Sequence, residues 1–205
     1  SPLPVQTTSL TLRITTMAIE RWADEYLDYV KIHEDGSHSV FPYNDPLVKT
    51  KKYPDGLPTY EYGITQPIRD KYTKSPNETE REYAARELNA EYVPRVKNKI
   101  GEEAWNRMPN GMKKWASDLT WNAGSISDSI AEHITNENYD GALKVGLEYV
   151  IASSRNKDGS KQSKVIRGLA DRVASRHNLA AADPAIKGVK PISSFDVVKN
   201  PDNTS

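Results

Sequence analysis

The sequence predicts an α+β fold, in which a first helix leads into a small sheet and then into a mostly helical remainder. Three observations carry this prediction. Apolar residues recur at helical spacing between residues 18 and 36. Five prolines and three glycines then exclude a long helix between residues 36 and 68. After residue 77 the helical spacing returns and continues to about residue 178.

Length and composition narrow the class of protein. The 205 residues predict one domain with, at most, a small appendage. The 28 basic and 28 acidic residues give a formal net charge of zero, which argues against a dedicated nucleic-acid binder. The absence of Cys excludes disulfides, thiolate metal sites and Cys nucleophiles. No apolar run approaches the roughly 18 residues of a membrane span, so none is expected.

Residues 1–16 are expected to form an extended arm. Pro2 and Pro4 exclude an early helix, and the Ser- and Thr-rich stretch after them favours an extended chain. This segment has one basic residue and no long apolar stretch, so it is not a recognisable signal peptide. Because the first residue is Ser rather than Met, we expect the chain to have been processed or cut from a longer protein.

The first helix is expected to run from about Ala18 to a stop at Gly36. Its apolar face has residues spaced three and four apart: Ile19, Trp22, Tyr26, Tyr29, Val30 and His33. Between residues 36 and 68, aromatic and β-branched residues separated by Pro and Gly favour short strands. The Asp55-Gly56 step there is a hairpin-type turn signal.

The rest of the chain is expected to be mainly helical. Asn77 or Thr79 caps a helix that Pro94 interrupts or ends. A break at residues 108–111 precedes a helix that Gly124 closes. The remaining predicted elements are helices at 127–135, 138–152 and 162–178, a loop at 156–160 and an irregular tail at 181–205.

The four His residues do not form a recognisable zinc motif. His33 and His38 are five residues apart with Gly36 between them, so they do not share a helix face as an i, i+4 pair does. The sequence also has no phosphate-binding Gly-rich loop and no Gly-x-Ser-x-Gly nucleophile elbow. Carboxylates therefore remain as the candidates for chemistry.

Glu34 is the first of these candidates. It lies at the end of the first predicted helix, where the partial negative charge of the helix C-terminus disfavours a carboxylate. A solvated helix-end Glu is the simpler alternative. The residues after it favour a functional role, because they form two ordered motifs: Tyr43-x-Asp45-Pro46 and Gly56-x-x-Thr59-x-x-Tyr62-Gly63.

This order of motifs resembles the phage-type, T4-like lysozyme family. In that family a helix ends in a catalytic Glu, a Tyr-x-Asp-Pro-like step follows, and a hairpin containing Gly and Thr comes next. Three later segments are similar to the family in the same order: 77–80, 115–124 and 168–176. The resemblance spans about residues 20 to 178 and implies a lysozyme-like α+β catalytic domain at 17–180.

The spacing of the motifs departs from that of the family. Ten residues separate Glu34 from Asp45 and thirteen separate Asp45 from Thr59, more than the family has at either step. Glu61 stands where the family has its first hairpin Gly. The longer second segment leaves Asp55 as a rival of Asp45 for the second carboxylate.

The resemblance implies an inverting muramidase, which cleaves bacterial peptidoglycan between N-acetylmuramic acid and N-acetylglucosamine. Glu34 would protonate the glycosidic oxygen, Asp45 would orient and activate water, and Thr59 would help to hold that water. Burial beside aromatic rings is expected to raise the pKa of the acid. No metal or organic cofactor is implied. Two structural alternatives to these catalytic roles stay open: Thr59 is only a strand residue, and Asp45 is only a turn residue.

Six residues are expected to contact the substrate: Tyr43, Lys49, Lys51, Lys52, Tyr62 and Asn122. The three lysines form a dense basic cluster that would attract an anionic wall, although a solvated loop is an equal alternative. A helix-end role is the alternative for Asn122. Arg172 and Arg176 are expected to anchor the first helix or to pair with surface acids. Glu148 and Asp171 are candidates for such pairs.

Three alternative functions stay open. In the first, the chain is an inactive lysozyme-like structural or wall-binding module. In the second, it is the catalytic domain of a virion protein or toxin. In the third, it is a lytic transglycosylase. We expect a monomer or a module of a larger phage or toxin protein. Without a recognisable signal peptide, the enzyme is expected to pass from the host cytoplasm to the periplasm and cell wall through holin pores, in a virion or with a delivery partner.

Overall fold

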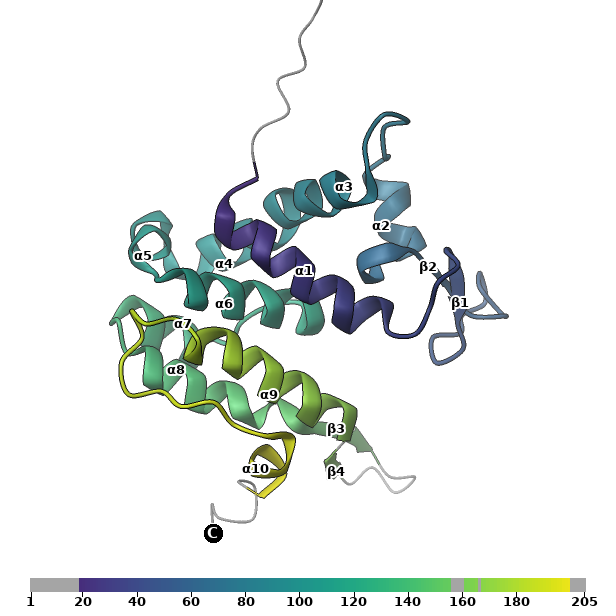
Figure 1. Ribbon diagram of the computed structural model, residues 1–205. Helices are drawn as coiled ribbons and strands as arrows, with labels where there is room; N and C mark the ends of the chain where they lie inside the picture. Colours follow the sequence, from purple (N-terminus) through teal and green to yellow (C-terminus); the bar gives the residue numbers. More distant parts are fainter. Residues whose placement is uncertain (1–18, 156–160, 166, 200–205) are drawn as a thin grey trace, which may run out of the picture.

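The computed structural model describes residues 19–155, 161–165 and 167–199 (Figure 1). It confirms the α+β class, with a two-stranded antiparallel sheet after the first helix and a mostly helical remainder. The predicted arm at 1–16 and the predicted loop at 156–160 lie outside the described residues. Within the described ranges, no helix is long and apolar enough to cross a bilayer.

The first helix, α1 (Arg21–Asp35), follows the predicted apolar spacing. Trp22, Tyr26 and Val30 lie one turn apart on one face and are buried in the core. The helix ends at Gly36, whose φ of 56° is a left-handed conformation that glycine adopts readily. α1 crosses the molecule between the β region and the helical part and packs against both (Figure 1).

The predicted sheet region is confirmed after α1. Its elements are β1 (Tyr43–Asp45), β2 (Leu57–Thr59), the 3-10 turn η1 (Glu61–Gly63) and α2 (Gln66–Lys71). The two strands are antiparallel, and Tyr43 lies opposite Thr59. The turn into β2 requires Gly56, because a Cβ there would lie 2.5 Å from the carbonyl oxygen of Asp45.

A capping box begins the next helical segment. The hydroxyl of Thr79 accepts a hydrogen bond from the Glu82 N–H at 3.1 Å, and the Glu82 carboxylate accepts one from the Thr79 N–H at 2.9 Å. Thr79 rather than Asn77 is therefore the cap. The segment consists of α3 (Glu80–Glu87), the π-helical turn η2 (Leu88–Tyr92) and α4 (Val93–Ile100).

Pro94 is predicted to interrupt or end this helical segment, and of these two alternatives it does not end it. The π-helical turn interrupts the α-helix just before Pro94, and α4 then begins at Val93. Pro94 therefore lies in the first turn of α4, where the fixed φ of proline suits a helix. The chain continues as α-helix to Ile100.

The second half of the chain is a bundle of helices, in which α6 packs against α9 and α7 against α8 (Figure 1). These helices are α5 (Glu102–Arg107), α6 (Asn110–Ala123), α7 (Asp128–Thr135), α8 (Tyr139–Gly146), α9 (Arg167–Ala181) and α10 (Ser194–Lys199). Gly124 closes α6 with a φ of 92°, as predicted. The helix predicted at 127–135 is also confirmed, as α7.

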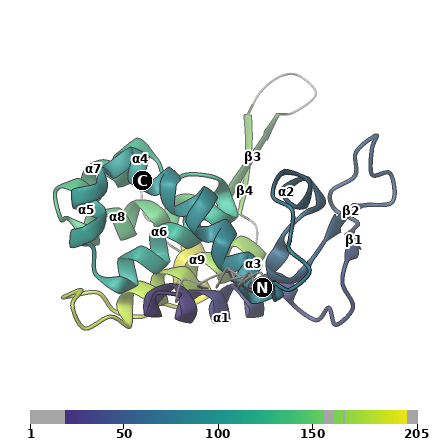
Figure 2. The ribbon, with the colours of Figure 1, turned by 90° about the horizontal axis from the view of Figure 1, so that it is seen from above.

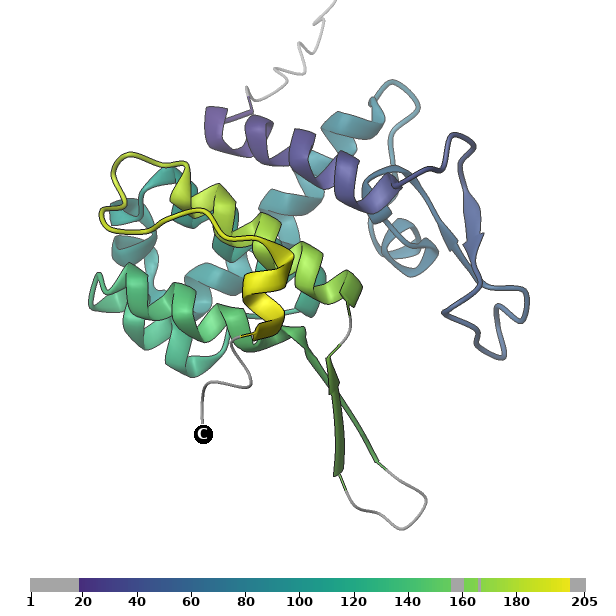
Figure 3. The same ribbon diagram turned by 60° about the horizontal axis from the view of Figure 1, so that its bottom comes forward.

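A hairpin replaces parts of two predicted helices. β3 (Ile151–Arg155) and β4 (Lys161–Val165) pair antiparallel, and the hairpin extends away from the helices (Figures 2 and 3). The helix predicted at 138–152 ends at Gly146, followed by the 3-10 turn Leu147–Val150, and the one predicted at 162–178 begins only at Arg167. Both strands contain Ser, which has a low helix propensity. The prediction of helix from apolar spacing did not take this into account.

The prediction of an irregular tail at 181–205 is wrong for residues 194–199, which form α10. Ser193 and Asp196 make a reciprocal cap at its start. The Ser193 N–H donates to the Asp196 carboxylate at 2.9 Å, and the Asp196 N–H donates to the Ser193 hydroxyl at 3.2 Å. This Ser-x-x-Asp spacing is a capping-box signature that supplies the two donors at the helix start with acceptors.

The core connects α1 with the helical part. Tyr26 of α1, Tyr83 of α3 and both Trp115 and Leu119 of α6 are almost completely buried in it. Because close-packed side chains allow little movement, the end of α1 is held on a rigid base. The candidate site lies at that end.

Candidate active site

The Glu34 carboxylate projects from the last turn of α1. One of its oxygens, Oε1, accepts a hydrogen bond from Nη1 of Arg172 at 3.0 Å, and the side chain is 24% exposed. Burial raises the pKa of Glu34, the charge and hydrogen bond of Arg172 oppose this, and the negative charge of Asp118 adds to the rise. The net result is a pKa above the ordinary value, as predicted for the acid.

Backbone from η1 lies directly against this carboxylate. A Cβ on Gly63 would lie 2.6 Å from the Oε2 atom of Glu34, and the φ of Gly63 is 68°. The preceding Tyr62 also has a positive φ, of 63°, and its N–H donates to the buried Asp35 carboxylate at 2.7 Å. Asp35 therefore fixes η1 to the end of α1, and Gly63 leaves the room that Glu34 occupies.

For the lytic activity that the family resemblance implies, Gly63→Ala is expected to lower the rate about a hundredfold, because the methyl group must displace the Glu34 carboxylate and misplaced reacting groups cost rates of that order. It is also expected to lose about 1 kcal/mol of stability from its positive φ. Gly188→Ala is the matched control, since Gly188 has a φ of 74° but open space around its Cβ position. The lytic rate and the unfolding curve of each variant are measured. Equal lytic rates for the two variants would contradict this role of Gly63.

Tyr43, Asp45 and Thr59 lie on the two paired strands near Glu34. Burial raises the pKa of Tyr43 first, and the negative charges of Asp45 and Glu34 raise it further, so both carboxylates are within electrostatic reach of this phenol. Asp45 Oδ1 accepts from the Leu47 N–H at 2.9 Å, while the buried Thr59 hydroxyl donates to the Leu57 carbonyl at 3.0 Å. The hairpin that follows α1 thus carries a carboxylate and a hydroxyl, and its Tyr43 feels the charges of both Asp45 and Glu34.

Asp55, the rival of Asp45, lies elsewhere on the hairpin. It is exposed in the turn that precedes Gly56, beyond the paired strands. The charge of Asp45 is among those that raise the pKa of Tyr43.

The residues predicted to contact substrate are placed very differently from one another. Tyr62 is only 3% exposed and packs in the core, so its prediction as a contact residue is corrected. Asn122 is exposed near the end of α6, and its Oδ1 accepts from Nη2 of Arg176 at 3.0 Å. The three predicted lysines are exposed in the loop between β1 and β2: Lys49, Lys51 and Lys52.

A buried ion cluster behind Glu34 was missed by sequence reasoning. Asp118 of α6 is completely buried, and it accepts hydrogen bonds from Arg172 Nη2 at 2.6 Å and Arg176 Nε at 2.7 Å. The hydroxyls of Tyr26 and Tyr29 also donate to it, at 3.0 and 3.4 Å. One carboxylate thereby connects α1, α6 and α9.

This cluster corrects the predicted surface pairing of the arginines with Glu148 or Asp171. Arg172 and Arg176 are buried, and Arg172 does anchor the first helix, through Glu34. The available signal was Asp118 itself, an acid on the apolar face of a predicted helix beside Leu119. A buried acid needs cationic partners, and two arginines one turn apart supply them.

The charge of Asp118 is maintained by its two partners. Burial alone raises the pKa of Asp118, but the hydrogen bonds and charges of Arg172 and Arg176 outweigh burial and lower it. With Glu34 ionised, the two arginines and two acids are balanced; with Glu34 protonated, the cluster has one excess positive charge. Arg172 therefore restrains the rise in the pKa of Glu34 that burial causes.

His33 and His38 each lie against a tyrosine ring. His33 lies against the Tyr29 ring at 4.2 Å between centroids, and His38 stacks on Tyr43 at 3.6 Å. Among the residues that the structure describes, no three His, Asp or Glu side chains are grouped so as to hold a metal ion.

Comparisons with known proteins give one structural similarity. No family model matches the chain, and no curated protein sequence matches it significantly. Among solved structures, the chain is similar to an endolysin from Escherichia coli O157:H7 phage FAHEc1, with 19% sequence identity and a TM-score of 0.48. The match covers 86% of this chain and 98% of the endolysin chain.

Proposed function

We propose that this protein is a peptidoglycan hydrolase that cleaves a glycosidic bond of the bacterial cell wall, with Glu34 as the general acid. The observation that carries the proposal is the Glu34 carboxyl, which is largely buried, has a raised pKa and is fixed between Arg172 and Gly63. Glycosidic oxygen is a poor leaving group, so its departure needs a carboxylic acid that is still protonated near neutral pH.

The two strands that follow α1 would supply the other half of the proposed mechanism. Asp45 would take the proton of the attacking water, and because its Oδ1 already accepts from the Leu47 N–H, Oδ2 would face that water. The Thr59 hydroxyl already donates to the Leu57 carbonyl, so it would act toward the same water as an acceptor. The proposed bond is the one between N-acetylmuramic acid and N-acetylglucosamine.

Lytic rate is expected to fall as pH rises through the pKa of Glu34, since only the protonated carboxyl can donate. Burial raises that pKa above the ordinary 4.5, so the fall is expected at a higher pH than for an exposed Glu. Initial rates of turbidity loss at constant ionic strength measure it. Binding to the same peptidoglycan over the same pH range is the control, and a rate that rises with pH while binding stays constant would exclude Glu34 as the acid.

Incubation with purified peptidoglycan, followed by assay of reducing ends and mass spectrometry of the products, tests the reaction itself. Hydrolysis gives reducing ends, whereas a transglycosylase gives anhydro ends. Binding without any release would identify an inactive wall-binding module. Asp45→Asn and Asp55→Asn distinguish the two rival carboxylates: the former is expected to be inactive and the latter active.

A further inference from the structure

The segment between the two strands of the first hairpin has an unusual surface. This segment, Pro46–Pro54, is termed the lysine loop. Leu47 is 92% exposed and Val48 is 42% exposed. Three lysines are exposed beside them, and the loop has no acidic residue: Lys49, Lys51 and Lys52. In a chain with zero net charge, this loop combines concentrated positive charge with exposed apolar side chains.

Backbone hydrogen bonds hold the lysine loop in a defined shape. The Leu47 N–H donates to Asp45 Oδ1 at 2.9 Å, and the Val48 carbonyl accepts from the Leu57 N–H at 2.9 Å. Thr50 and Tyr53 exchange two backbone hydrogen bonds, at 3.2 and 3.1 Å. Lys51 and Lys52 therefore lie at the tip of a tight turn, and the exposure of Leu47 follows from fixed backbone geometry.

The positive charge of the loop is largely uncompensated by the protein. Lys52 has a distant acidic partner, Asp70, at 4.0 Å, and both side chains are more than half exposed. In the described part of the chain, no ion pair is found for Lys49 or Lys51. An anionic partner would therefore meet ammonium groups that need not break internal salt bridges first.

We propose that the lysine loop docks on an anionic phospholipid bilayer. The lysines alone would suit any polyanion, but a hydrated polyanion offers no partner for the exposed side chains of Leu47 and Val48. A bilayer surface offers both: headgroup phosphates for the ammonium groups, and the boundary of the acyl chains for the two apolar side chains. This proposal does not depend on the hydrolase proposal.

Sedimentation of the full chain with vesicles tests the proposal, using phosphatidylcholine alone and phosphatidylcholine mixed with phosphatidylglycerol. Binding is expected only to the anionic vesicles and is expected to decrease with salt. Replacing Lys49, Lys51 and Lys52 together with Ser is expected to weaken binding roughly 100-fold at low salt, from the usual contribution per lysine. Leu47→Ser is expected to weaken it about tenfold, because it removes the inserted side chain without changing charge.

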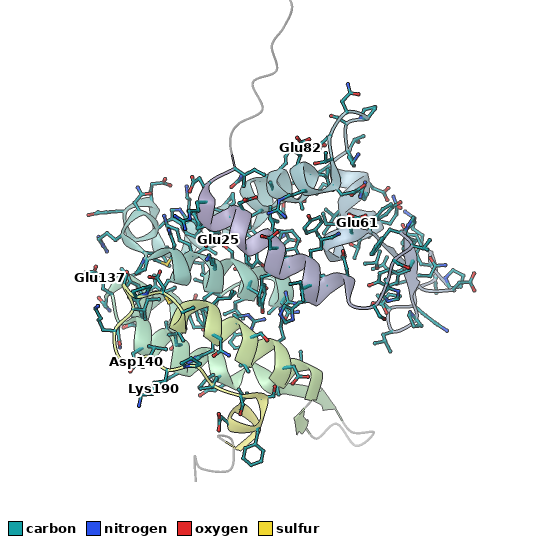
Figure 4. The ribbon with its side chains drawn as sticks, in the orientation of Figure 1. Glu25, Glu61, Glu82, Glu137, Asp140 and Lys190 are labelled. Atoms are coloured by element: carbon teal, nitrogen blue, oxygen red, sulfur yellow. The ribbon has the colours of Figure 1, made fainter. Side chains whose placement is uncertain are left out.

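Matched controls separate the loop from general surface chemistry. Replacing Lys144, Lys187 and Lys190 with Ser makes the same change in net charge away from the lysine loop; Figure 4 labels Lys190. Phe195→Ser removes another exposed apolar residue, 73% exposed, on α10. Both controls are expected to bind like the unmodified chain, and thermal unfolding checks that every variant is folded.

Three results would overturn the proposal. The first is binding to purified peptidoglycan through the three loop lysines without any binding to anionic vesicles, which would identify the wall as the partner. The second is vesicle binding that Leu47→Ser leaves unchanged. The third is vesicle binding that the control lysine variant weakens as much as the loop variant does. Loss of lytic activity affects neither vesicle binding nor peptidoglycan binding as a readout. Failure of the hydrolase proposal can therefore be distinguished from failure of this one.

Discussion

The Glu34→Gln variant is expected to lose about a thousandfold in lytic rate, because an amide cannot donate the proton that the leaving oxygen needs and acid catalysis contributes effects of that order. The substitution keeps the size of the side chain. Its amide oxygen can still accept the hydrogen bond that Arg172 Nη1 now gives to Oε1. Reducing-end release from purified peptidoglycan measures the loss.

Glu34→Gln is not expected to unfold the protein. The pKa of Glu34 is raised in the folded state, so the folded chain holds this proton more tightly than the unfolded chain does. The ionised carboxylate therefore lowers stability as pH rises above 4.5, and removing its charge relieves that cost at neutral pH. The unfolding midpoint of the variant is expected to equal or exceed that of the unmodified chain.

Glu61→Gln is the matched control for this experiment. Glu61 lies in η1, close to the same end of α1, and pairs with Lys31 at 3.3 Å (Figure 4). Its carboxylate is partly exposed, so its loss is expected to leave the lytic rate and the stability almost unchanged. A fully active Glu34→Gln variant would remove Glu34 as the acid.

The Asp118→Asn variant is expected to lose about 3 to 5 kcal/mol of unfolding free energy at neutral pH, the usual cost of leaving a buried charge without its partner. Arg172 and Arg176 would both lose the carboxylate that compensates them. The new amide N–H groups would also face arginine donors, so at least one hydrogen bond cannot be replaced. Urea unfolding of the two proteins measures the difference.

The pH dependence of that difference has a definite sign. Asp118 has a lowered pKa in the folded state, so its stabilisation is fully present above the ordinary Asp pKa and disappears as pH falls through the lowered one. The gap between the unmodified chain and the variant is therefore expected to close only in strongly acidic solution.

Glu25→Gln is the control for Asp118. Glu25 is an exposed acid of α1 that pairs with Arg21 and Lys114 (Figure 4). Because solvent screens exposed pairs, its loss is expected to leave the free energy of unfolding almost unchanged. If Asp118→Asn destabilises the protein no more than Glu25→Gln does, the buried cluster is not the structural anchor that its hydrogen bonds indicate.

Local rules in the sequence were enough for much of the fold. Apolar spacing located α1, Gly36 its end, and the capping signal at Thr79 the start of α3. Those rules depend on neighbours within a few turns, which the sequence states directly. They did not predict the place of Pro94 in the first turn of α4, because that place depends on the π-helical turn before it. They also did not predict β3, because its hydrogen bonds come from pairing with another strand.

The candidate site was predictable only in part, for the same reason. Glu34 could be identified from its position at a helix end and from the motifs that follow it. The pKa of Glu34 depends first on its burial and then on the charges of Arg172 and Asp118, which lie on two distant helices whose packing no local pattern describes. Tyr62 was correctly placed in a turn, but it was also expected to contact substrate, and its side chain is buried in the core.

The ion cluster behind Glu34 also has a consequence for the order of folding. Glu34 and Arg172 are 138 residues apart in the chain, so their contact closes a very long loop and carries a high entropic cost. Contacts of this range are expected to form late, after the local helices and the first hairpin. A chain whose α9 has not yet docked would have Glu34 and both strands of the sheet without Arg172, so under the proposed function activity would appear only when folding is complete.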